Sequence, residues 1–318
     1  MPDSPSLSRP VGGLSPLAQE LLPVLYRHRL LSTSQLHQLL TPTATSSRYL
    51  RRLLGRLRAE RLVAATERRT VGRSELLWYA TPLGCEIVEA GRELAPRAYR
   101  MTEQAAAGQL QEHTLAVNAT GLAFVTHARR LGDDCGPLDW DPELAHRIRD
   151  GEDRLGDEAF LVPDAVIRYV RSDREQRMLL TFFAEIDRAT MSVADLAGKL
   201  TRYARYSSYV PQVLVGGRRR TVRTTTREAW RDRYPAFPRI LLVLTGAPPA
   251  ALARRTADLR ALAAADGRLH HAAGQLQAGI TTLTQLQQHG PFAPIVTPVL
   301  GDPVPTDVLM RQPSAAAA

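Results

Sequence analysis

Three carboxylates and one lysine between residues 164 and 199 are the group of side chains best suited to chemistry. Glu185 and Asp187 lie two residues apart in the apolar segment MLLTFFAEID, so on a β-strand they project from the same face. Counting outward from the polar turn RSDREQR pairs Asp164 of the preceding strand with about Glu185. Three adjacent carboxylates repel one another unless a cation lies among them, and oxygen ligands favour Mg²⁺ or Mn²⁺. The spacing therefore predicts a metal site formed by Asp164, Glu185 and Asp187.

Lys199 is the single lysine among 41 basic residues. A planar guanidinium replaces a compact ammonium poorly, so a single lysine among arginines indicates a candidate position for a required ammonium; the alternative is a leftover exposed lysine. We expect a helix from about Ser192 to Ser207 to point Lys199 back at the acids. A metal ion lowers the pKa of bound water and stabilises charge on a phosphoryl transition state, so the predicted catalytic set is Asp164, Glu185, Asp187 and Lys199. The alternative is that the acids are ordinary strand-end residues without a metal.

The elements that must position these residues form a mixed-sheet α/β domain over residues 100–301. The order of apolar patterns is helix, three strands, helix, strand. The predicted segments are a helix at 103–131, strands around 144–148, at 161–170, 178–187, 210–217 and 239–246, and a further strand at 293–300. Residues 1–15 and 302–318 are rich in Pro, Ser, Gly or Ala and are expected to be disordered tails.

The first part of the chain, residues 16–90, has the pattern of a winged helix-turn-helix. Apolar spacing predicts helices at 17–28, 32–40 and 46–63, followed by a hairpin of strands at 62–69 and 74–81. The turn Thr81-Pro82-Leu83-Gly84 is expected to close this domain, with the boundary to the next between 91 and 102. In the third helix the residues expected to face inward are Tyr49, Leu50, Leu53, Leu54 and Leu57.

Positive charge concentrates on the third helix and the hairpin. Between Arg48 and Arg73 there are nine arginines against two acids, Glu60 and Glu67, which is a local charge of +7. Such a stretch is typical of phosphate contacts, with the third helix in the major groove of double-stranded DNA. The candidate DNA-binding residues are Arg48, Arg51, Arg52, Arg56, Arg69 and Arg73. The alternative is a solvated basic face on a protein-interaction module.

Composition narrows the partners and the compartment. A net charge of +9 and a pI near 10.1 favour a polyanionic partner. No apolar run is long enough to span a bilayer and the N-terminus lacks a signal-peptide pattern, so a cytoplasmic protein without a membrane partner is expected. Cys85 and Cys135 are too few for a disulfide framework or a structural zinc site. A homodimer is the default for a winged helix on palindromic DNA.

The segments Pro163-Asp164 and Glu185-Ile186-Asp187 resemble the PD-(D/E)XK nuclease superfamily, which has a restriction-endonuclease-like fold. That superfamily usually places a lysine two residues after the second acid, where this sequence has Asp187. A lysine moved to the following helix is a known variation, and Lys199 fits it. The resemblance implies a metal-dependent DNA endonuclease or nickase.

The whole chain resembles the actinobacterial replication-relaxation family, which is associated with plasmids and integrative elements. The resemblance runs from about Leu17 to Gly301 and rests on the winged helix, a long helix carrying His113, and the segments PDAVIRY, FFAEIDRAT, KLTRYARY and FPRILLVLT. It implies a role in plasmid replication or mobilisation.

Two further functions compete with the nuclease. One is a non-catalytic DNA-binding regulator or origin-binding accessory with a degenerate nuclease-like domain. This function requires only the arginines. The other is a relaxase with Tyr203 or Tyr206 as nucleophile, although these tyrosines fit packing positions better and the chain has no His-apolar-His motif.

Overall fold

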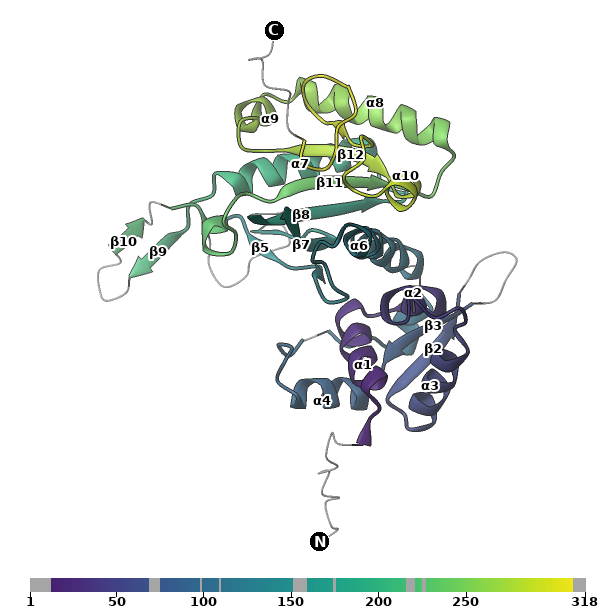
Figure 1. Cartoon of the computed structure of the whole chain (residues 1–318). Helices are drawn as coiled ribbons and strands as arrows, with labels where there is room; N and C mark the ends of the chain where they lie inside the picture. The colour runs from purple at the N-terminus through teal and green to yellow at the C-terminus, as the bar shows by residue number, and fades with distance from the viewer. Residues whose placement is uncertain are drawn as a thin grey trace. The chain divides into compact units, whose positions relative to one another are not determined.

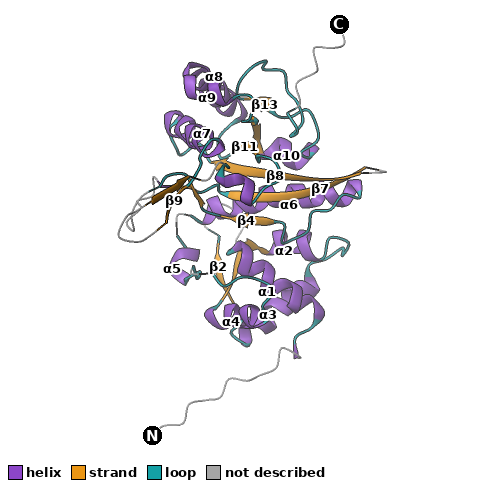
Figure 2. Cartoon of the chain, turned by 90° about the vertical axis from the view of Figure 1, so that its left-hand side faces the viewer, coloured by secondary structure: helices purple, strands orange, loops and turns teal. Residues whose placement is uncertain are grey.

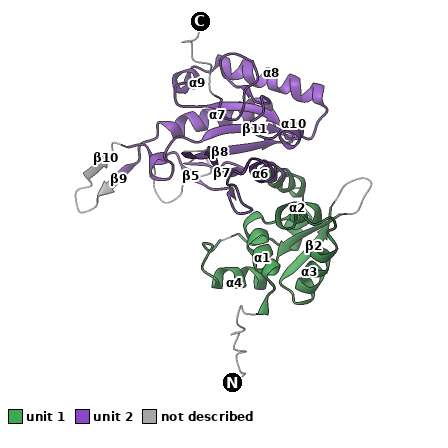
Figure 3. Ribbon diagram, in the orientation of Figure 1, with its two compact units in different colours: residues 1–118 green, residues 119–318 purple. Residues whose placement is uncertain are grey.

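The structure is a computed structural model that describes residues 13–68, 75–97, 99–108, 110–150, 159–173, 176–215, 221–224 and 227–310. The chain divides into two compact units, residues 1–118 and 119–318, which are coloured separately in Figure 3. The division falls inside helix α6 (Gln111–Leu131), whereas the sequence pattern suggests a boundary between 91 and 102.

The first unit contains the predicted three helices followed by two antiparallel strands. The helices are α1 (Pro16–His28), α2 (Thr33–Leu40) and α3 (Arg48–Ala59). The strands β2 (Val63–Glu67) and β3 (Leu76–Ala80) pair with each other, and β3 also pairs with the short strand β1 (Leu31–Ser32). A capping box in which Ser32 and Gln35 bond each other's backbone amides starts α2. Local sequence signals therefore define most of this unit.

Three details of the first unit differ from the prediction. Tyr49 is 50% exposed rather than buried, because the inner face of α3 is filled by leucines. The turn at Thr81 starts another helix, α4 (Pro82–Ala90), because its hydroxyl caps the amide of Gly84. The predicted long helix at 103–131 is interrupted into α5 (Glu103–Ala106) and α6, and Leu110 between them is 70% exposed.

The second unit is built on a mixed six-stranded sheet with the order β13-β12-β11-β8-β7-β4. Figure 1 labels its four central strands, β12, β11, β8 and β7. Strands β7 (Ala165–Asp173) and β8 (Gln176–Asp187) form the predicted hairpin. Strand β11 (Arg239–Leu244) runs parallel to β8 and to β12 (Ala278–Thr282), so each of these neighbours is reached by a crossover. The edge strands are β4 (Trp140–Pro142) and β13 (Thr297–Pro298).

Two predicted strands of this unit are present but pair outside the main sheet. The strand expected around residues 144–148 is β5 (His146–Arg147), which pairs with β6 (Phe160–Leu161), and the edge strand β4 of the main sheet lies earlier in the sequence. The segment expected at 210–217 forms β9 (Gln212–Val215), which pairs with β10 (Thr221–Thr224) in a separate ribbon. Strand β12 was not predicted.

Helices cover both faces of the sheet (Figure 2). Phe183 of β8 lies in a core cluster with residues of α7 (Val193–Ser207) and α8 (Pro249–Ala265). The adjacent Phe182 packs against Phe124 of α6, with ring centroids 5.2 Å apart. Neighbouring strand residues point to opposite faces, so α6 covers one face of the sheet and α7 with α8 the other.

The end of the described chain is ordered. After α9 (Gly267–Ala272) and α10 (Leu283–His289), Val296 and Thr306 form a β-bridge, and Val308, Leu309 and Met310 are buried. The tail predicted to be disordered from residue 302 is therefore packed through residue 310. Within the described part of the chain, no helix is both long and apolar enough to cross a membrane.

Candidate functional site

The β7–β8 hairpin brings two of the predicted acids together. Ala165 pairs with Ala184, so extending the register by one pair places Asp164 opposite Glu185, as predicted. A carboxylate oxygen of Asp164 accepts the backbone N–H of Ile186 at 2.7 Å. The carboxylate of Asp164 is therefore held across the end of the hairpin beside Glu185.

Helix α7 delivers the chain's lysine to these acids. The Nζ of Lys199 lies 2.5 Å from an oxygen of Glu185 and 3.8 Å from an oxygen of Asp164. Tyr203 follows one turn later on the same helix face, and its hydroxyl donates to the other oxygen of Glu185 at 2.5 Å. The sequence predicted the approach of Lys199. It missed this contact of Tyr203, since a packing tyrosine and a hydrogen-bonding one look alike in sequence.

Burial dominates the electrostatics of this acid–lysine cluster, which we define as Asp164, Glu185, Lys199 and Tyr203. Glu185 is 1% exposed, and burial together with the charge of Asp164 raises its pKa to about 7. Burial alone would lower the pKa of Lys199, but the two carboxylates outweigh it and the pKa is raised. Burial and Glu185 raise the pKa of Tyr203 well above its usual value. The two acids therefore favour the charged form of Lys199, while burial favours the neutral form of Glu185.

Asp187, the third predicted acid, is engaged elsewhere. Arg255 of α8 donates from its Nε to a carboxylate oxygen of Asp187, and from a terminal nitrogen to the carbonyl of Met191 at 2.5 Å. The other oxygen of Asp187 accepts the backbone N–H of Ala189 at 3.0 Å. Sequence reasoning missed Arg255, because one arginine among many in a helix that was not predicted carries no signal.

The predicted cage of three carboxylates is not assembled. Within the described residues, no group of three His, Cys, Asp or Glu side chains is placed to hold a metal ion. Mg²⁺ in phosphate-processing sites is commonly held by one or two carboxylates, with water and substrate phosphate completing its shell. Asp164 and Glu185 provide the two carboxylates of that smaller ligand set, but both oxygens of Glu185 are bonded by Lys199 and Tyr203, so a metal ion would have to displace one of these partners. Asp187 is held by Arg255, away from the other two acids.

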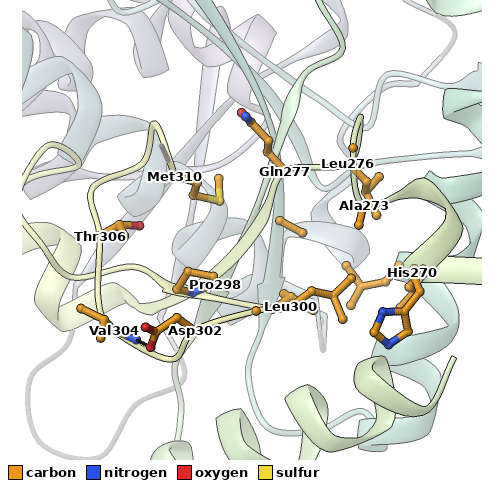
Figure 4. A pocket seen from close by; sticks show the side chains of 16 residues that line it. His270, Ala273, Leu276, Gln277, Pro298, Leu300, Asp302, Val304, Thr306 and Met310 are labelled. Atoms are coloured by element: carbon orange, nitrogen blue, oxygen red, sulfur yellow. Dashed lines mark hydrogen bonds between the residues drawn. The ribbon is translucent and has the colours of Figure 1, made fainter. Parts of the chain in front are cut away.

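A pocket of about 910 Å³ lies in another part of the second unit (Figure 4). Its wall comes from α9, β12, β13 and the segment that follows, and Leu300, Leu276 and Met310 give it a largely apolar lining. His270 and Asp302 lie on opposite sides of it in the figure. No member of the acid–lysine cluster lines this pocket, so the cavity and the candidate chemistry do not coincide.

In the first unit, α3 presents the predicted arginines to solvent. Its leucines at 50, 53, 54 and 57 are buried, and its five arginines are exposed: Arg48, Arg51, Arg52, Arg56 and Arg58. Within the described residues, none of the five forms a salt bridge, whereas Arg68 after β2 is paired with Glu75 and Glu112. The candidates Arg69 and Arg73 lie outside the described residues. The exposed side of α3 is thus a cationic surface that no described acidic side chain neutralises.

The remaining candidates do not join either site. Tyr206 is 2% exposed and packs against His146 and Phe183, so both tyrosines of the relaxase hypothesis are buried. His113 is half-buried on the part of α6 that belongs to the first unit. A second arginine-rich stretch, GGRRRTVRTTTREAWRDR at 216–233, lies partly outside the described residues, at 216–220 and 225–226.

The geometry defines a mixed α/β protein with a cationic helix in one unit and a buried acid–lysine cluster in the other. The family model described as replication-relaxation matches residues 22–215, more than half of the 318 residues, and the chain belongs to that family. The match includes α3 and Lys199 and ends before Arg255. Membership suggests a role in the replication or relaxation of DNA. Neither the curated proteins nor the solved structures contain a match.

Proposed function

We propose that this protein binds double-stranded DNA during replication or mobilisation of a plasmid or integrative element. In this proposal the first unit is a winged helix-turn-helix and α3 enters the major groove. The observation that carries it is the set of five exposed arginines on α3, none of which has an acidic partner among the described residues. Membership of the replication-relaxation family supports the same conclusion.

The two faces of α3 explain how the helix can be both stable and cationic. Burial of Leu50, Leu53, Leu54 and Leu57 anchors the helix against its unit, at about 1.5–3 kcal/mol for each fully buried side chain. The arginines contribute little to that anchoring because they face water. Each arginine that neutralises a phosphate releases a condensed counterion, so a helix with five of them binds DNA strongly at low salt.

Charge reversal tests the binding proposal. We expect Arg51→Glu, Arg52→Glu and Arg56→Glu together to reduce affinity for a labelled mixed-sequence duplex by about a hundredfold or more at low salt. The matched control reverses three exposed arginines of the second unit, Arg130, Arg254 and Arg268, and makes the same change in net charge. Equal affinity of the α3 variant and the control would exclude α3 as the DNA-binding surface.

The acid–lysine cluster favours a second candidate function, a metal-dependent DNA endonuclease or nickase of restriction-endonuclease type. The observation behind it is the contact of the chain's single lysine with Glu185 and its approach to Asp164. Asp164 and Glu185 would hold Mg²⁺ or Mn²⁺, which when bound would supply an activated water and stabilise phosphoryl charge. Lys199 would donate to a phosphate oxygen, and Tyr203 would hold Glu185 in place.

A plasmid assay tests this candidate. Supercoiled DNA is incubated with the protein and Mg²⁺, Mn²⁺ or EDTA, and the products are separated on a denaturing gel. We expect metal-dependent nicking that Glu185→Gln and Lys199→Arg abolish and that Asp258→Asn, an exposed acid on α8, leaves intact. Binding without cleavage in every condition would instead support a regulator or origin-binding accessory, with the second unit as a docking or dimerisation platform.

A further inference from the structure

The outward face of α3 has a gap in its side chains, at Gly55. Successive residues of an α-helix are about 100° apart, so the buried leucines define an inner face and Gly55 lies near the middle of the opposite side. Three of its four neighbours at spacings of three and four residues are Arg51, Arg52 and Arg58, and the fourth is Ala59. A surface without a side chain is therefore surrounded by cations.

Nothing in the described fold requires a glycine at this position. A Cβ added to Gly55 would meet no atom within 4 Å, and its backbone is not in the left-handed region. A glycine inside a helix lowers helix stability by about 1 kcal/mol relative to alanine. The residue therefore costs stability without relieving crowding, in contrast to Gly84, where a Cβ would meet the carbonyl of Leu62.

Four of the five arginines form two rows on either side of Gly55. At about 100° per residue, Arg51 and Arg58 fall on one flank of the exposed face, while Arg52 and Arg56 fall on the other. The fifth, Arg48, lies in line with Gly55 about two turns earlier, at the start of the helix. A helix in the major groove has a phosphate strand on each side and base edges in front of its central line. This arrangement matches the two arginine rows with the gap between them.

We infer that Gly55 is the point at which α3 comes closest to the base pairs, with the two arginine rows contacting the phosphates of opposite strands. The inference rests on the proposed DNA-binding function and adds to it the docking position of the helix. Glycine allows close approach of a backbone to a ligand because it has no Cβ. A larger side chain would hold the helix away from the groove.

Substitution with side chains of increasing size tests this docking position. Gly55→Ala and Gly55→Leu are compared with Gly198→Ala and Gly198→Leu, because Gly198 is likewise exposed within a helix and a Cβ there also meets nothing within 4 Å. The probe is a labelled mixed-sequence duplex about three helical turns long. Thermal unfolding and circular dichroism are recorded for every variant, and we expect each to be as stable as the natural protein or more stable.

We expect Gly55→Leu to weaken duplex affinity by about tenfold or more, the equivalent of one good base contact, with a smaller loss for Gly55→Ala. Both Gly198 variants should bind as the natural protein does. If the charge reversal at Arg51, Arg52 and Arg56 weakens binding and Gly55→Leu does not, the docking inference is overturned while the binding proposal stands. If neither weakens binding, both are overturned.

Discussion

Helix α3 and the acid–lysine cluster place positive charge in opposite environments. The arginines of α3 face solvent without a described acidic partner, whereas Lys199 lies against one buried carboxylate and near a second. Exposed charges contribute little to folding and remain available to an external polyanion. The half-buried Lys199 is already paired with internal carboxylates, so its loss affects the fold before it affects any ligand. The same charge therefore has different consequences in the two units.

Removal of the Lys199 ammonium, which neutralises the buried Glu185, should have the largest effect on stability. Lys199→Met leaves Glu185 and Asp164 without their counter-charge, and we expect the unfolding free energy of the second unit to fall by about 3–5 kcal/mol. Arg52→Met on α3 is the matched control and should change stability by about 0.5 kcal/mol or less. Hydrogen exchange of the β8 and α3 amides measures each unit separately. Equal losses of unfolding free energy in Lys199→Met and Arg52→Met would contradict the difference between the two environments.

The stability of the second unit should also depend on pH through His146. Burial, with a smaller contribution from Arg233, lowers the pKa of His146 from 6.5 to about 4, so the unfolded chain takes up this proton first as pH falls. The stability that His146 contributes is complete above about pH 6.5 and is lost toward pH 4, a change of about 3 kcal/mol.

Denaturant titrations at several pH values check the His146 prediction. The difference in unfolding free energy between the natural protein and His146→Phe isolates the histidine, because the carboxylates are common to both. We expect this difference to change between pH 6.5 and 4 in favour of the phenylalanine variant at low pH. A constant difference would show that His146 has an ordinary pKa.

Removal of the Tyr203 hydroxyl, which donates to Glu185, should lower stability by a smaller amount. Tyr203→Phe removes one of the two side-chain donors to this carboxylate, and we expect stability to fall by about 1–2 kcal/mol. Tyr206→Phe is the control, because no described residue forms a hydrogen bond with the Tyr206 hydroxyl. Thermal unfolding at neutral pH compares the two variants. An equal change in both would show that the bond to Glu185 adds nothing.

Features set by local sequence were predictable in both units. The helices α1 to α3 follow from apolar spacing, with a capping box at the start of α2, and the β7–β8 register follows from a short turn with matched strands on either side. The predicted register places Asp164 beside Glu185, and the predicted helix places Lys199 near both acids. The structural reason is that each contact lies within one hairpin or one adjoining helix.

Features that depend on distant packing were not predictable. Arg255 pairs with Asp187 across 68 residues of sequence. Nothing in the sequence indicates that Asp187 pairs with this arginine instead of binding a metal ion. Strand β12 is short and buried, and its parallel pairing with β11 depends on the helices between them. Tyr49 was misplaced because it lies at the edge of the apolar face of α3, where leucines already fill the core.

The salt dependence of duplex affinity tests the role of α3 most directly. The logarithm of the binding constant is measured against the logarithm of salt concentration for the natural protein and for the combined Arg51→Ala, Arg52→Ala and Arg56→Ala variant. If all three arginines contact phosphates, the slope should become shallower by about 3, since each contact contributes about 0.9. An unchanged slope would contradict the account and leave α3 as a solvated basic face.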